Sequence, residues 1–181
     1  MLFRSCDGLV NMMSFWKFDD VFEEDGPGLE PFDGSFGLIA LGGIKKPSYT
    51  AFALLHKLGQ ERIAQDFPEV LVTRRLDGSL AIVAWNLVDP DKKGNERSVE
   101  FEIHGVSPSS RILLSRVDSE HGNTLAAYKS MGSPRYPTQK QIAELNRIAE
   151  TNSVQNLRLS KGSITLELPV NGVLLLEVPE K

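Results

Sequence analysis

Residues 14–24 read SFWKFDDVFEE, and residues 31–39 read PFDGSFGLI. Residues 11–18, which overlap the start of the first stretch, are mostly apolar with single polar residues between and show no helical period. This pattern is typical of a strand buried on both faces in a parallel barrel. Between the two stretches, residues 25–35 contain three Gly and two Pro, a composition typical of a loop. Residues 36–41 can form a further short strand.

A helix is predicted after this loop, from about residue 49 to about residue 58. Ser48 is a suitable N-cap, and Gly59 is a plausible stop. The apolar residues of the expected helix recur at three-residue spacing, at Phe52, Leu55 and Leu58. We therefore expect residues 1–62 to form one β-loop-α unit.

From residue 67 the pattern changes to short alternating strands. Asp77-Gly78 stands between two β-rich runs, a strong signal for a hairpin. Residues 99–103 alternate strictly between polar and apolar, so one face of that strand should be buried. The predicted strands cover residues 70–75, 79–86, 99–103, 111–117, 157–159, 164–168 and 173–178. About seven short strands are typical of an antiparallel β-sandwich.

One helix is predicted as an insertion in this sandwich, capped by Thr138 and running to about Glu150. Its inner face should carry Ile142, Leu145 and Ile148. The expected fold is therefore mainly β, with an antiparallel β-sandwich over residues 67–181, an N-terminal β/α unit and one inserted helix.

Composition and charge exclude several functional classes. The net charge of −4 and the pI near 5.4 argue against nucleic acid as a partner, because Lys and Arg are scattered among the acids. No stretch approaches a membrane span. Cys6 is the single cysteine and cannot form an internal disulfide. No continuous signal-peptide core is visible near the N-terminus, so a cytoplasmic chain is expected.

Neither a metal nor a cofactor is predicted. His56 lies in the expected helix, His104 ends an alternating strand, and His121 lies in a glycine turn. None of these histidines has a metal-ligand spacing to Cys, Asp or Glu.

The two opening stretches carry a family resemblance. Residues 14–24 resemble the last barrel strand of β-xylosidases of glycoside hydrolase family 39, where a WTFSDVFEE segment leads into PFHGGFGL. Two differences stand out. Lys17 and Asp19 replace the usual Thr and Ser, and Asp33-Gly34-Ser35 replaces His-Gly-Gly.

Further islands follow in the family's order. Residues 42–49 resemble the entry to the last barrel helix, while residues 116–138 and 166–177 are similar to parts of the family's C-terminal β-domain. The resemblance implies that residues 1–62 are a remnant of a (β/α)8 barrel. It also implies an interface role, near the junction of the β-domain and the barrel, for Asp118, His121, Arg135 and Tyr136; the alternative is that these residues bind a ligand.

The resemblance also implies a sugar site. Glu24 would hydrogen-bond sugar hydroxyls, Trp16 and Phe18 would supply an apolar platform, and Glu23 and Asp33 would line the pocket. The plainer alternative is that Glu23 and Glu24 are solvated and that Trp16 belongs to the core. As neighbours in an extended segment, Glu23 and Glu24 point to opposite sides, whereas retaining glycosidases need two facing carboxyl groups roughly 5 to 5.5 Å apart.

The family's two catalytic glutamates come earlier in its sequence, so we expect them to be missing here and leave the catalytic residues unassigned. The leading hypothesis is a β-xylosidase-like polypeptide that binds xylose-type sugars or xylo-oligosaccharides, or that assembles into a homo-oligomer or with a barrel-bearing chain. One alternative is a minimal β-xylosidase whose site is rebuilt by oligomerisation. Another is a purely structural β-sandwich.

Overall fold

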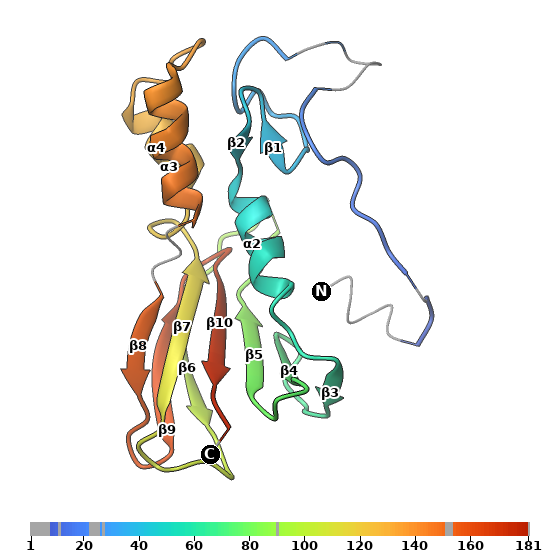
Figure 1. Cartoon of the computed structure of the whole chain (residues 1–181), viewed down its shortest axis with the longest axis vertical. Helices are drawn as coiled ribbons and strands as arrows, with labels where there is room; N and C mark the ends of the chain where they lie inside the picture. Colours follow the sequence, from blue (N-terminus) through green and yellow to red (C-terminus); the bar gives the residue numbers. More distant parts are fainter. Residues whose placement is uncertain are drawn as a thin grey trace.

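The chain folds into two antiparallel sheets, a short hairpin and three helices within the described residues, which are 8–10, 12–21, 26, 28–89, 91–150 and 154–180 of a computed structural model. Six strands form one sheet in the order β3-β4-β5-β10-β7-β8, two form the sheet β6-β9, and two form the hairpin β1-β2. Figure 1 shows α2 beside the six-stranded sheet, with α3 and α4 beyond one end of the strands.

The strands are β1 (Ile39–Ala40), β2 (Ile44–Lys45), β3 (Glu61–Ile63), β4 (Val70–Arg74), β5 (Leu80–Trp85), β6 (Arg97–Glu102), β7 (Arg111–Val117), β8 (Gln155–Arg158), β9 (Ser163–Leu168) and β10 (Val173–Val178). The helices are α2 (Pro47–Leu55), α3 (Thr124–Ser130) and α4 (Gln139–Glu150). Among the described residues, no helix has both the length and the apolar character needed to cross a membrane.

The main core lies between the two sheets. Because side chains alternate along a strand, β5 sends Ile82 and Ala84 into this core, and β10 sends Leu174 and Leu176. The smaller sheet contributes buried side chains from β6 and β9 to the same core: Phe101, Leu166 and Leu168. The antiparallel β-sandwich expected from the sequence is thus confirmed.

A second core lies on the opposite face of the six-stranded sheet, under α2. Leu54 of α2 is completely buried against Val83 of β5, Val117 of β7 and Leu175 of β10. This contact buries the six-stranded sheet on both faces and explains why β5 is buried at four successive positions. The N-terminal helix is therefore a layer of the sandwich.

A third cluster joins the insertion to the hairpin β1-β2. Ala40 and Ile44 of the hairpin pack against Tyr128 of α3 and Leu145 of α4. Asn146 reinforces the contact, because its Oδ1 accepts from the amide of Lys45 at 2.9 Å and its Nδ2 donates to the carbonyl of Gly43 at 3.0 Å. The Thr124 hydroxyl also donates to the Lys45 carbonyl, at 2.7 Å.

The strands predicted from residue 70 onward are all present, with bounds shifted by a few residues. β7 and β10 match the prediction, and β4 and β5 form the predicted hairpin around Asp77-Gly78. The strand β3 was not predicted, because this exposed three-residue edge strand, which pairs with β4, has no alternating apolar pattern. The strand β3 spans the predicted boundary at residue 62. The division into residues 1–62 and 67–181 concerns independent folding units and remains a prediction.

Two local expectations about the N-terminal unit were wrong. Residues 12–18 form no strand within the described chain, where Asp19 makes only an isolated parallel bridge to Ile39; a parallel strand needs neighbours on its edges. Lys46, not Ser48, is the N-cap residue of α2, which starts at Pro47, where proline's fixed φ suits a first helical turn.

The insertion holds two helices instead of the single one expected. The additional helix is α3, and its N-cap Asn123 accepts a hydrogen bond from the Ala126 amide at 3.0 Å. An Asn directly before a short apolar run was the available signal.

The Leu54 contact yields a test of α2 as a sandwich layer. We expect Leu54→Ala to lower the free energy of unfolding by about 2 to 5 kcal/mol, because it leaves a cavity against the six-stranded sheet. The matched control is Leu76→Ala at a side chain that is 89% exposed, where a change within about 0.5 kcal/mol is expected. Urea unfolding followed by circular dichroism measures both; equal effects would exclude α2 from the cooperative unit.

Candidate functional site

A buried ion pair anchors the loop that carries the predicted sugar site. The Asp20 side chain is 2% exposed and the Lys46 side chain 10%. Lys46 Nζ lies 2.6 Å from Asp20 Oδ2 as an ion contact and donates a hydrogen bond to Oδ1 at 2.8 Å. Nζ also donates to the Ser35 carbonyl at 2.6 Å. Each charge is compensated, as burial of ions requires.

The same carboxylate holds the backbone of the loop. Oδ1 of Asp20 accepts from the Gly37 amide at 2.9 Å. A Cβ at residue 37 would lie 2.4 Å from the carbonyl carbon of Asp19, so only glycine fits this close approach. Residues 31–37 are thereby fixed against the segment that carries Trp16 and Phe18.

Trp16 and Phe18 face outward, whereas Lys17 between them is buried. The exposed fractions are 69% for Trp16 and 66% for Phe18, so the alternative that Trp16 is a core residue is wrong for this chain. Lys17 Nζ lies 5.1 Å from the centre of the Phe36 ring, and Phe36 is also exposed. We call the exposed rings of Trp16, Phe18 and Phe36 the aromatic face.

Asp33 is exposed in the anchored loop. Its Oδ1 accepts from the Ser35 amide at 3.0 Å. This hydrogen bond is the main reason that the pKa of Asp33 is lowered, and the charges of Lys46 and Lys17 lower it further. Asp33 therefore presents an ionised carboxylate at neutral pH. A Cβ at Gly28 would lie 2.6 Å from its Oδ2, so the preceding loop also passes close by.

The structure brings three of the predicted site residues onto one anchored substructure: Trp16, Phe18 and Asp33. Glu23 and Glu24 lie outside the described residues, and their roles remain predictions. Asp20 and Lys46 were not predicted as site residues, since a single sequence offers no sign that these two charges are buried and paired.

The predicted junction residues fall into two groups. Arg135 contacts the N-terminal unit, because its Nε donates to the Leu29 carbonyl at 3.2 Å and its guanidinium lies 5.5 Å from the exposed Tyr136 ring. Asp118 and His121 instead pair with each other at 2.8 Å. Burial would raise the pKa of Asp118, but hydrogen bonds from the Glu120 amide, the His121 ring and the His121 amide outweigh it and lower the pKa.

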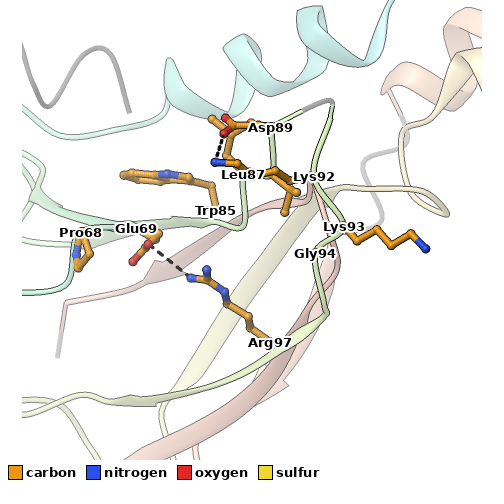
Figure 2. Close-up of a pocket in the computed structure, with 10 residues that line it drawn as sticks. Pro68, Glu69, Trp85, Leu87, Asp89, Lys92, Lys93, Gly94 and Arg97 are labelled. Carbon is orange, nitrogen blue, oxygen red and sulfur yellow. Dashed lines mark ion pairs between the residues drawn. The ribbon is translucent and has the colours of Figure 1, made fainter.

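A separate cleft of about 730 Å³ opens at the end of β5 (Figure 2). Two ion pairs flank it, Glu69 with Arg97 at 3.4 Å and Asp89 with Lys92 at 2.8 Å. Over the ranges described above, no group of three or more His, Cys, Asp and Glu side chains is arranged to hold a metal ion.

The anchoring pair yields a stability test. We expect Lys46→Met to cost about 3 to 5 kcal/mol, because it leaves the Asp20 carboxylate buried without its cation. Replacing both residues, Asp20→Leu with Lys46→Met, should cost less than the single change. The control is Glu144→Gln, which breaks an exposed pair with Arg147 on α4 and should cost less than about 1 kcal/mol. Thermal unfolding measures all variants; a Lys46→Met effect no larger than the control would contradict the anchoring role.

Two curated proteins are similar to this chain. A beta-xylosidase of Geobacillus stearothermophilus is 35% identical over 173 residues, which are 94% of this chain and 34% of that protein. A beta-xylosidase of Caldicellulosiruptor saccharolyticus is 32% identical over 142 residues, 76% of this chain and 29% of that protein. The chain thus spans about a third of the length of these relatives.

The fold agrees with solved structures. The crystal structure of a monomeric beta-xylosidase from Caulobacter crescentus CB15 superposes with a TM-score of 0.83 at 29% identity, over 98% of this chain and 39% of that one. Residues 3–161 match the model of the family described as glycosyl hydrolases family 39. The resemblance read from the sequence is confirmed, and the chain belongs to glycoside hydrolase family 39.

Proposed function

We propose that this chain forms one wall of a binding site for xylose-type sugars in a β-xylosidase-like assembly, and that it does not hydrolyse xylosides by itself. The observation that carries the proposal is the aromatic face beside the anchored Asp33 loop. Exposed aromatic rings offer an apolar platform for a sugar ring, and an ionised carboxylate accepts hydrogen bonds from sugar hydroxyls.

The carboxylates near this wall argue against catalysis by the chain alone. Retention of configuration needs a nucleophile and an acid roughly 5 to 5.5 Å apart across the scissile bond. Asp20 is buried and paired with Lys46, and Asp19 Oδ1 accepts from the Val21 amide at 2.9 Å. Asp33 is left as an exposed acid, and the adjacent Glu23 and Glu24 would point to opposite sides of an extended segment.

An assembly role accompanies the sugar role. The aromatic face leaves the large side chains of Trp16, Phe18 and Phe36 exposed. Exposed apolar side chains are features of protein contact surfaces. A second copy of the chain, or a barrel-bearing chain of the same family, would cover them.

Sugar binding is testable because the chain has two tryptophans. In a Trp85→Phe background, Trp16 is the only tryptophan and reports on the aromatic face. We expect xylotriose to change Trp16 fluorescence saturably with a dissociation constant of about 1 mM or weaker, since one wall supplies about 4 kcal/mol or less. Asp33→Asn should weaken binding about tenfold by removing charged hydrogen bonds.

A matched control exists for Asp33. Asp77 belongs to a second Asp-Gly-Ser turn, in which its Oδ1 likewise accepts from the Ser79 amide at 3.0 Å. Asp77→Asn should leave binding unchanged. Hydrolysis of an aryl β-xyloside by the parent should not exceed the buffer blank. A purely structural module would give no fluorescence change, and turnover lost in Glu24→Gln or Glu23→Gln would establish the minimal-enzyme alternative.

Assembly is tested by sedimentation of the whole chain. We expect the weight-average mass to rise with protein concentration, and Phe18→Glu to return it to that of a monomer, because a charge on the aromatic face opposes burial. Leu76→Glu is the control, since this exposed leucine lies on the β4-β5 turn, away from the aromatic face. A parent mass that stays monomeric at every concentration would exclude self-association.

A further inference from the structure

The cleft at the end of β5 is built from the loop between β5 and β6, from the strand ends at Trp85 and Arg97, and from the two residues before β4 (Figure 2). It shares no lining residue with the aromatic face. Its lining consists of one aromatic ring, a few apolar side chains and five charged ones: Pro68, Glu69, Trp85, Leu87, Val88, Asp89, Lys92, Lys93, Gly94 and Arg97.

The loop that shapes the cleft is held in place from both ends. Val88 donates its amide to Asn171 Oδ1 at 3.0 Å. Asn86 is 1% exposed, and its Nδ2 donates to the Asn95 carbonyl at 2.9 Å and to the Leu168 carbonyl at 3.1 Å. A Cβ at Gly94 would lie 2.3 Å from Val88 Cγ2. The two arms of the loop therefore pack tightly, and the cleft wall is formed in advance.

The charges of the cleft are largely compensated. Glu69 and Asp89 each pair with a cation of the cleft, Arg97 and Lys92 respectively, which leaves Lys93 as the excess charge and a net charge of +1 (three cations minus two acids). A phosphate-type ligand would need more uncompensated positive charge. A purely apolar ligand would have to desolvate both ion pairs.

Trp85 gives the cleft its apolar element. It is half-buried and packs against the second core beneath α2, so its indole is held in position, and it borders the cleft (Figure 2). Leu87 beside it is 60% exposed. A fixed ring next to paired donors and acceptors suits a neutral ligand that has both apolar ring faces and many hydroxyls.

We propose that this cleft is a second carbohydrate site, on the β-sandwich, that binds a neutral oligosaccharide. The choice of xylose-type units rests on the proposed function, whereas the site itself rests on the cleft. Arg97 and Glu69 donate and accept hydrogen bonds at one edge, and Trp85 supplies the apolar contact.

The experiment uses the whole chain with Trp16→Phe, so that Trp85 is the only tryptophan. Xylotetraose is the probe. We expect a saturable change in Trp85 emission, and Glu69→Gln together with Arg97→Met should weaken it about tenfold. The matched control is Glu61→Gln with Arg74→Met, another exposed strand pair at 3.3 Å, which should leave binding unchanged. Circular dichroism melting of each variant verifies the fold.

The outcomes separate the two sites. A Trp85 response supports the second site even if Trp16 remains silent in the Trp85→Phe protein, a result that would refute the proposed function alone. No Trp85 response to xylotetraose or to cellotetraose overturns the second site, as does a response that the Glu69 and Arg97 changes leave intact. A response to inorganic phosphate instead of sugar would overturn the ligand class.

Discussion

The ion pair between Asp20 and Lys46 joins three parts of the chain that are distant in sequence: the N-terminal extended segment, the loop before β1 and the start of α2. Its cost is the desolvation of two charges, which close contact and the bonds to Ser35 and Gly37 offset. Because Lys46 is also the N-cap residue of α2, the loop that carries Asp33 cannot move independently of the helix. The position of the Asp33 loop thus depends on this contact.

The helix α2 connects the anchored loop to the sandwich. Leu54 is fully buried against the six-stranded sheet, while the hairpin β1-β2 just before the helix is buried against α3 and α4. The N-terminal unit is therefore packed on two sides against the later part of the chain. Two apolar sides of this unit are thus covered from within the chain. The side chains of the aromatic face stay exposed.

The sequence predicted the sandwich well because its signals are local. Alternation in β6 and the Asp77-Gly78 turn between β4 and β5 depend on neighbouring residues only. The strand expected at residues 12–18 was not found, because a parallel strand depends on neighbouring strands to pair with, and residues 28–89 and 91–150 supply none there. At the candidate site, Trp16 and Phe18 were identified as site residues through the family resemblance. The burial of Asp20 and Lys46 is a tertiary property, so no pattern in a single sequence indicated it.

Rigidity has a consequence for binding at this wall. A loop that must be ordered when a ligand arrives spends part of the contact energy on its own immobilisation. Here Gly37 cannot be exchanged for a larger residue, Asp33 is oriented by the Ser35 amide, and both are tied to Asp20 and Lys46 before any sugar is present. A single preorganised wall still contacts only one side of a ligand. Under the proposed function, this loop would therefore complete a sugar site whose other walls come from a second chain.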